Sequence, residues 1–276
     1  MAAVEPLVGA RTLVMGACNV TPDSFYDGGK FPSAETAREH ILQLSEDGAD
    51  LIDIGGESSR PGSDPVSVEA EQQRVYPVLD QLAGAGLTIS IDTYHADTAR
   101  GALQLGVCMI NDITALRGDP NMAAVIAEAD CECVLMHMQG DPKRMQDAPR
   151  YNDVVDDVCA FFEERIQFAT ANGIREDRIW LDPGFGFGKT VGHNLTLLRR
   201  LNEFRRFGRP VLIGTSNKSM IGAVLDLPVG DRLEGTAATV AVAVMNGADA
   251  VRVHDVKSMK RVAAMADAIV GKTHYE

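Results

Sequence analysis

The chain alternates between short apolar runs and longer segments with helical periodicity, and this alternation restricts its possible folds more than any other feature. Apolar runs lie at residues 12–18, 51–54, 88–91, 107–110, 133–136, 178–181, 211–213 and 250–253. Each run is apolar at successive positions, which is typical of a parallel strand buried on both faces. The sequence therefore predicts eight short strands joined by crossover connections.

Helical segments fill the gaps between these runs. They are predicted at residues 34–47, 69–83, 95–105, 120–129, 152–173, 192–207, 218–226 with 232–246, and 255–270. Several of them are followed by a glycine at which a helix can end in the left-handed conformation, namely Gly48, Gly86, Gly106, Gly173, Gly208 and Gly247. Repeated strand-then-helix units in 276 residues favour an α/β fold, a closed (β/α)8 TIM barrel forming a single domain over residues 1–276 with its core at about 12–270. A doubly wound open sheet is the structural alternative.

The net charge limits the kinds of binding partner that the protein can have, and the cysteine content bears on the cellular compartment in which it works. The formal net charge of −13 argues against nucleic acid or an anionic membrane as the main partner, although a local pocket can still bind a small anion. No apolar run reaches the roughly 18 residues of a membrane span, and the first residues lack the apolar core of a signal peptide. The five cysteines are irregularly spaced, and Cys131 and Cys133 are interpreted as buried strand thiols rather than as a metal pair. We expect a cytoplasmic protein.

Each predicted strand ends in a polar or glycine-rich phrase. These phrases lie at residues 19–29, 55–62, 92–93, 111–112, 137–151, 182–189, 214–219 and 252–255. A single phrase of this kind can be an ordinary turn or helix cap. In a TIM barrel, however, all strands end at one rim, where the active site forms. The sequence therefore predicts one ligand site at that rim.

Two kinds of recognition group are present at the predicted rim. Asp92, Asn111, Asp182 and Lys218 offer donors and acceptors in fixed directions, which suits a flat heterocycle with ring nitrogens and an amino group. Phe187 either stacks on such a ring or belongs to the core.

The second kind of group suits a phosphate or pyrophosphate. It consists of Asn19, Arg252 and His254, with the arginine as a bidentate partner for phosphate oxygens. Arg252 and His254 are two residues apart on a strand, so both side chains are expected to face the same anion.

The strand-end phrases resemble, in order, the motifs of the dihydropteroate synthases. The matching segments are residues 19–29, 55–62, 90–93, 110–113, 181–189, 216–219 and 252–256, and the resemblance covers roughly residues 12–270. The resemblance implies a transferase with a TIM-barrel fold that assembles as a homodimer. Its reaction would be the condensation of 6-hydroxymethyl-7,8-dihydropterin pyrophosphate with p-aminobenzoate. The products would be 7,8-dihydropteroate, a folate precursor, and pyrophosphate. Sulfonamides would compete with p-aminobenzoate.

The resemblance also implies a role for each matched residue. Asp92, Asn111, Asp182 and Lys218 resemble the pterin-binding set, lined by Phe187, and Asn19, Arg252 and His254 resemble the pyrophosphate set, with Asn19 also the expected protein ligand of Mg²⁺. Asp92, Lys218, Arg252 and His254 are the expected catalytic residues. The phrases with Asp23, Phe25 and Asp27 and with Ser59, Arg60 and Pro61 resemble mobile loops that close over p-aminobenzoate, which Lys218 and Ser219 would also hold.

One position departs from the family pattern. The family usually has Ser-Arg-Lys after the seventh strand, whereas this chain has Ser216, Asn217 and Lys218. The alternative function is therefore a pterin-binding paralogue whose reaction is weakened or altered. A corrinoid-linked methyltransferase on a related barrel is a further alternative, but it has no need of the anion-binding pair. The glycine-rich phrase ending in Lys189 lacks the spacing of a nucleotide phosphate loop. His137 could be catalytic, but a histidine at a strand end is as often a structural hydrogen-bonding group, and it is not included among the expected site residues.

Overall fold

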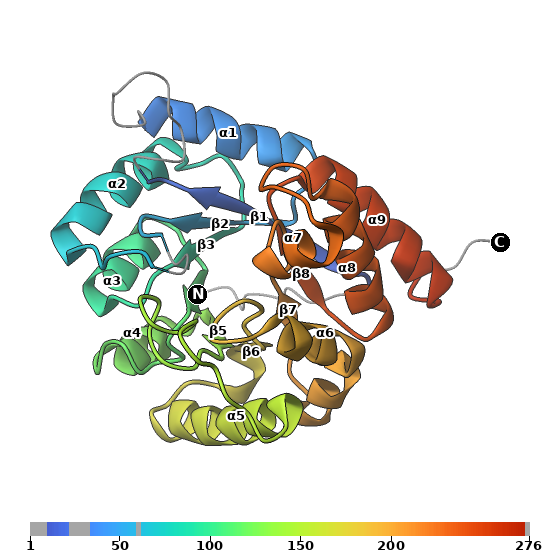
Figure 1. Ribbon diagram of the computed structural model, residues 1–276. Helices are drawn as coiled ribbons and strands as arrows, with labels where there is room; N and C mark the ends of the chain where they lie inside the picture. Colours follow the sequence, from blue (N-terminus) through green and yellow to red (C-terminus); the bar gives the residue numbers. More distant parts are fainter. Residues whose placement is uncertain (1–9, 22–33, 59–61, 274–276) are drawn as a thin grey trace.

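A computed structural model of the chain describes residues 10–21, 34–58 and 62–273, and it shows a ring of parallel strands surrounded by helices (Figure 1). The strands are β1 (Leu13–Asn19), β2 (Leu51–Gly55), β3 (Ile89–Asp92), β4 (Met109–Asp112), β5 (Glu132–Met136), β6 (Ile179–Asp182), β7 (Leu212–Ile213) and β8 (Ala250–Val253). They form one parallel sheet in the order β6-β5-β4-β3-β2-β1-β8-β7. A parallel bridge between Leu181 and Val211 joins the two ends of this order. The barrel is therefore closed, which confirms the predicted fold and excludes the open sheet.

Each strand divides its side chains between the inside and the outside of the barrel. The inward-facing apolar residues form a small separate cluster of Leu13, Met15, Leu51, Met109, Val134, Trp180, Leu212 and Ala250. The outward-facing residues join the much larger core that packs against the helices. Both faces of every strand are thus covered, which explains why the strands are apolar without strict alternation. Near the start of β5, the buried Glu132 accepts from Trp180 Nε1 (2.8 Å) and Arg178 Nη1 (2.9 Å).

The helices surround the strands as predicted, with one exception. They are α1 (Ala34–Glu46), α2 (Val68–Gln81), α3 (Ala96–Gln104), α4 (Met122–Ala129), α5 (Val154–Ala171), α6 (Val191–Arg199), α7 (Ser219–Leu225), α8 (Leu233–Met245) and α9 (Val256–Ile269). The prediction of one helix over residues 192–207 is wrong, because α6 ends at Arg199 and a 3₁₀ segment follows (Leu201–Phe207). The Asn246 side chain donates to the carbonyl of Leu198 (2.8 Å), which satisfies an acceptor at the end of α6 from outside the helix.

The ends of the helices fit the predicted glycine pattern, and the length and composition of the described helices bear on whether any of them could span a membrane. Gly208, for example, adopts φ +61° at the end of the 3₁₀ segment, a conformation that other residues rarely adopt. Among the described residues, no helix is both long and apolar enough to span a membrane.

Candidate active site

The polar residues of the rim meet around one buried carboxylate, Asp53 of β2. Its side chain is fully buried, and its Oδ2 accepts from Arg252 Nε of β8 (2.6 Å) and from Asn111 Nδ2 of β4 (3.0 Å). Its Oδ1 accepts from the hydroxyl of Ser90 on β3 (2.6 Å). Four strands therefore place their side chains against one another inside the rim. Asp53 was not predicted as a site residue, because it lies within the apolar run at residues 51–54.

Arg252 lies between two carboxylates. In addition to the bond to Asp53, its Nη2 donates to Asp92 Oδ2 of β3 (3.1 Å). Burial lowers the pKa of Arg252, but the negative charges of Asp53 and Asp92 more than offset that effect, and the pKa is raised overall. Burial also raises the pKa of Asp92 to about 7, against the opposing influence of Arg252. This arrangement fixes a permanent positive charge at the rim.

Asn111 presents an unsatisfied acceptor. Its Nδ2 is used by Asp53, whereas its Oδ1 is buried and has no hydrogen-bond partner in the part of the chain that the structure describes. A buried acceptor without a donor is costly unless a ligand supplies one. Asn111 Oδ1 therefore marks a position where a ligand N–H group would be bound.

Asp182 lies on the opposite side of the rim, at the end of β6. It is buried, and its Oδ1 accepts from the backbone N–H of Gly184 (2.7 Å). Burial raises the pKa of Asp182 to about 6, partly offset by that hydrogen bond and by the positive charges of Lys218 and Lys189. The side chain is thus a second acceptor at the rim, and its role in pterin binding stays a prediction.

Phe187 and Lys218 form a stacked pair near Asp182. The Lys218 ammonium lies 4.4 Å from the centre of the Phe187 ring, a cation–π arrangement. Phe187 is largely buried within a cluster that also contains Ile113, Met136, Met138 and Met145. The ring therefore belongs to a small satellite core, one of the two environments predicted from the sequence, while its stacking on a ligand ring stays a prediction.

Lys189 anchors the loop that carries Phe187. Its buried ammonium donates to the carbonyls of Gly184 and Phe187 (both 3.0 Å) and lies 2.8 Å from Nδ1 of His137. Burial lowers the pKa of Lys189 to about 7 and that of His137 to about 2, so the imidazole is neutral. The sequence did not assign a role to Lys189, while the structural interpretation of His137 agrees with these contacts.

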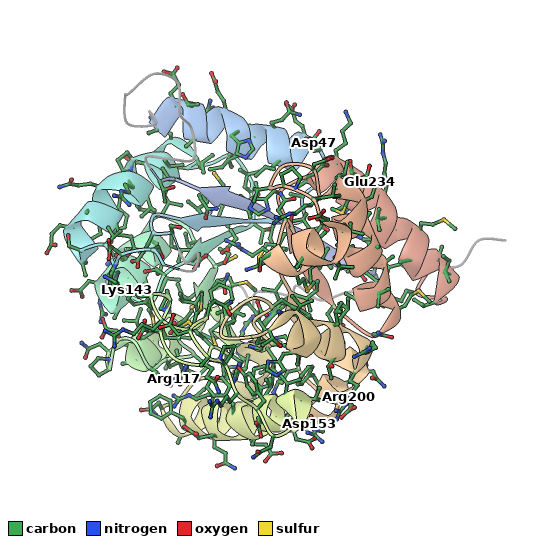
Figure 2. All side chains as sticks on the ribbon, viewed as in Figure 1. Asp47, Arg117, Lys143, Asp153, Arg200 and Glu234 are labelled. Atoms are coloured by element: carbon green, nitrogen blue, oxygen red, sulfur yellow. The ribbon has the colours of Figure 1, made fainter. Side chains whose placement is uncertain are left out.

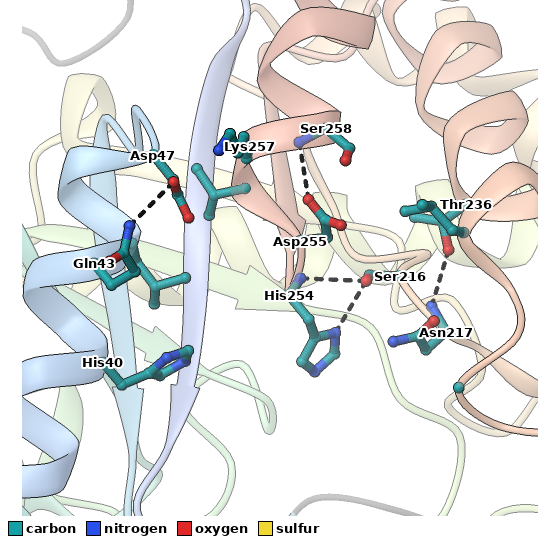
Figure 3. Close-up of a pocket in the computed structure, with 14 residues that line it drawn as sticks. His40, Gln43, Asp47, Ser216, Asn217, Thr236, His254, Asp255, Lys257 and Ser258 are labelled. Carbon is teal, nitrogen blue, oxygen red and sulfur yellow. Dashed lines mark hydrogen bonds between the residues drawn. The ribbon is translucent and has the colours of Figure 1, made fainter.

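His254 is held by the loop after β7. Ser216 Oγ accepts from the backbone N–H of His254 (3.2 Å) and lies 2.9 Å from its Nδ1. Both residues line a cavity of about 570 Å³, which extends between α1 and the first turn of α9 (Figure 3). Asp92, Asn111 and Asp182 are not among its lining residues, so this cavity is distinct from the strand-end cluster.

Asn19 faces Asp92 across a glycine. A Cβ atom added to Gly55 would lie 3.5 Å from Asn19 Oδ1 and 3.7 Å from Asp92 Oδ2. The absence of a side chain at Gly55 therefore leaves space between two oxygen atoms at the rim, both of a kind that can bind a metal ion. Ser219 lies at the first position of α7, directly after Lys218, and is exposed.

Some predicted residues lie outside the described residues, and one departure from the family has a local account. Phe25, Ser59, Arg60 and Pro61 fall outside the described ranges, as do Asp23 and Asp27. Asn217 adopts φ +57°, and asparagine tolerates this left-handed conformation better than most residues with a side chain. Its N–H donates to Thr236 Oγ1 (3.2 Å), and its carbonyl accepts from Arg232 (2.9 Å).

Comparisons with known proteins agree with this geometry. The family of pterin-binding enzymes matches residues 15–254. The dihydropteroate synthase of Bacillus subtilis is 47% identical over 263 residues, which cover 95% of this chain and 90% of that protein. The chain therefore belongs to the dihydropteroate synthases, a family of pterin-binding transferases.

Solved structures support the same assignment. The dihydropteroate synthase of Yersinia pestis, solved with a sulfonamide drug complex, matches with a TM-score of 0.91 and 42% identity over 95% of each chain. The enzyme of Clostridium difficile, solved in the presence of pteroic acid, matches with a TM-score of 0.89 and 46% identity over 95% of this chain and 98% of that one.

Proposed function

We propose that the rim cluster is where this chain condenses 6-hydroxymethyl-7,8-dihydropterin pyrophosphate with p-aminobenzoate, and that its residues divide into a pterin set and a pyrophosphate set. The observation that carries the proposal is the buried Oδ1 of Asn111, which has no partner among the described residues and lies in the same cluster as Asp92 and Arg252. A pterin carries ring N–H and amino groups that acceptors of this kind can bind.

The pterin would lie between Asn111 and Asp182. Asn111 Oδ1 and the Asp182 carboxylate would accept hydrogen bonds from the ring, and Asp92 would accept a further one. Phe187 and Lys218 would cover one face of the ring, since the charge of Lys218 is close enough to Asp182 to offset part of the rise in its pKa that burial causes. The walls of such a site are buried, which strengthens each hydrogen bond relative to water.

The pyrophosphate would lie against Arg252, His254 and Asn19. Arg252 keeps its positive charge because Asp53 and Asp92 raise its pKa, and Ser216 holds the imidazole of His254. These groups would neutralise the charge that builds up on the leaving group. The bond between the pterin methylene carbon and the pyrophosphate oxygen breaks, and the oxygen keeps the electron pair.

The second substrate would then attack the electron-poor methylene. The amine of p-aminobenzoate supplies the electron pair for the new C–N bond and loses a proton to solvent. We propose a dissociative order, in which the pyrophosphate leaves first and the Asp92 carboxylate stabilises the positive methylene. Lys218 and Ser219 would hold p-aminobenzoate beside the predicted contacts Phe25, Ser59, Arg60 and Pro61. Sulfonamides would compete for this position.

The residues present fit a bound Mg²⁺. The open space above Gly55 lies between the oxygens of Asn19 and Asp92, and Mg²⁺ prefers oxygen ligands and is often held by one or two protein groups together with substrate phosphates. Asn19 would be the protein ligand. When bound, Mg²⁺ would supply further neutralisation of the pyrophosphate charge.

Two features support the proposed homodimer and compartment. α8 and α9 lie side by side (Figure 1), and each exposes apolar side chains near its C-terminal end. These are Val242 and Met245 on α8 and Met265 and Ile269 on α9. Exposed apolar side chains gathered on adjacent helices are typical of an interface.

All five cysteines are free thiols, which supports a reducing, cytoplasmic environment.

Pyrophosphate release tests the proposed reaction directly. The purified protein is incubated with the pterin pyrophosphate and Mg²⁺, with and without p-aminobenzoate. Release that depends on p-aminobenzoate, together with dihydropteroate formation, is the expected result. Pterin binding without such release would instead support the altered paralogue.

A further inference from the structure

Asp53 is the buried carboxylate on which the two proposed halves of the site converge. It lies in the middle of β2, and in the strand register it pairs with Ser90 of β3. Its Oδ2 accepts from both Arg252 (2.6 Å) and Asn111 (3.0 Å), while its Oδ1 accepts from Ser90 (2.6 Å). A fully buried charge of this kind needs partners to offset its desolvation, and its partners among the described residues are side chains of three other strands, β3, β4 and β8.

We propose that Asp53 is a positioning residue, which sets a pterin contact and a pyrophosphate contact at the same time without touching either ligand. The inference rests on the proposed roles of Asn111 and Arg252. It adds that the geometry of both residues is imposed by one carboxylate.

The first effect of Asp53 is to fix the orientation of the Asn111 amide. A carboxylate only accepts hydrogen bonds, so Asn111 must turn its Nδ2 toward Asp53. The amide oxygen is then forced to the other side, where it is the buried acceptor without a described partner. The choice between donor and acceptor at the pterin position is therefore made by Asp53.

The second effect is to hold the guanidinium of Arg252. Asp53 binds Nε and Asp92 binds Nη2, whereas Nη1 makes no hydrogen bond to any residue of the described ranges. These two contacts fix the orientation of the guanidinium, including its Nη1 group. Little movement of Arg252 is therefore needed when charge builds up on the leaving group.

Asp53→Asn is the sharpest test, because the side chain keeps its shape. An amide at position 53 offers both a donor and an acceptor, so Asn111 can turn over and present its NH₂ group to the pterin. We expect the affinity for a pterin without pyrophosphate, measured by calorimetry, to fall about tenfold. We expect inhibition by pyrophosphate to weaken severalfold, and kcat/KM to fall roughly 100-fold.

Glu132→Gln is the matched control. Glu132 is also a buried carboxylate paired with an arginine inside the barrel, but its partners are Arg178 and Trp180 near the start of β5 and β6. This variant is expected to unfold at a lower temperature and to bind the pterin as the unaltered protein does. It separates a loss of packing from a loss of positioning.

A double-mutant cycle shows whether Asp53 acts through Asn111. In the Asn111→Ala background, Asp53→Asn should cause little further loss of pterin affinity. Full additivity, or normal pterin and pyrophosphate binding by Asp53→Asn, overturns the proposal.

If Asp53→Asn does not fold, Ser90→Ala removes one partner of Asp53 and should lower pterin affinity severalfold, with the same dependence on Asn111. Unchanged affinity in Ser90→Ala would then overturn it. The unaltered protein is assayed in parallel, because its failure to bind pterin would contradict the proposed function rather than the role of Asp53.

Discussion

The two sides of the barrel rim hold their functional groups by different means. On the side of β2, β3, β4 and β8, strand side chains bind one another through charge, with Arg252 between Asp53 and Asp92. On the side of β6, the loop after Asp182 is pinned through its backbone. Lys189 binds two of its carbonyls, Tyr151 binds the carbonyl of Gly188 (2.7 Å), and Asn194 accepts from the N–H of Gly186 (2.8 Å).

This difference predicts different responses to substitution. A network of charged side chains fails when one charge is removed, because the others remain buried without a partner. A loop held by several backbone hydrogen bonds loses them one at a time, and its proposed function is to place Phe187. Changes on the charged side should therefore affect catalysis and stability as well as the pterin contact of Asn111, whereas changes on the loop side should affect pterin affinity without affecting the pyrophosphate contact.

Arg252→Met should give the largest effect. It removes the partner of two buried carboxylates, so we expect a loss of about 3–5 kcal/mol in the free energy of unfolding. It also removes the positive charge beside the proposed leaving group, so kcat should fall roughly 10²–10³-fold. Urea denaturation and steady-state kinetics measure the two effects.

Arg200→Met is the control for Arg252→Met. Arg200 pairs with Asp153 (2.6 Å; Figure 2) and with Glu203 (2.6 Å) in a partly exposed position, where each ion pair contributes about 0–1 kcal/mol. Equal losses of stability in the two arginine variants would contradict the contrast between buried and exposed charge.

Lys189→Met should give the second largest effect, on the loop side. The carbonyls of Gly184 and Phe187 lose their donor, partly offset by the removal of a buried charge, so we expect a loss of about 2 kcal/mol in the free energy of unfolding. The KM for the pterin substrate should rise, while inhibition by pyrophosphate stays the same. Lys143→Met, at the exposed surface (Figure 2), should change neither. Weakened pyrophosphate inhibition would show that the two sides are not independent.

Asp182→Asn should weaken pterin binding about 30-fold, the equivalent of about 2 kcal/mol. The N–H of Gly184 keeps an acceptor oxygen turned toward the loop, so the new NH₂ group must face the pterin. A donor then meets a donor on the ligand. Calorimetry with the pterin alone measures the change, and undiminished affinity would remove Asp182 from the proposed pterin set.

The sequence predicted the charged side of the rim in part. Asp92, Asn111 and Arg252 were predicted from their places at strand ends, since parallel strands all end at one rim. Asp53 was missed because it stands between Ile52 and Ile54, where an apolar run was the dominant pattern. A charged residue within a buried strand, two residues before the strand-end glycine, was the available signal.

The loop side was harder to predict. Asp182 and Phe187 were predicted from the motif, but the role of Lys189 depends on backbone carbonyls brought together by the turn itself. No spacing rule reveals such contacts. The end of α6 was missed for a similar reason, because the capping group, Asn246, comes from another helix. The left-handed backbone of Asn217 likewise became visible only in the folded loop.

The pH response of Asp182 should be the smallest effect, and it distinguishes ligand binding from stability. Burial raises the pKa of Asp182 to about 6 in the folded protein. Lowering the pH from 7.5 to 5.5, two values chosen for the test, therefore protonates about three quarters of this group and removes an acceptor, so pterin affinity should fall about fourfold.

Folding stability should move in the opposite direction. A carboxylate with a raised folded-state pKa costs stability above that pKa, and the cost is relieved as the pH falls through about 6, by about 1 kcal/mol over this interval. Other groups titrate in the same range, so the comparison is the difference between the unaltered protein and Asp182→Asn at each pH, measured by calorimetry and by urea denaturation. Opposite trends in that difference are expected because one proton removes a ligand contact and also relieves a buried charge. Parallel trends would mean that Asp182 stabilises the empty loop and does not face the pterin.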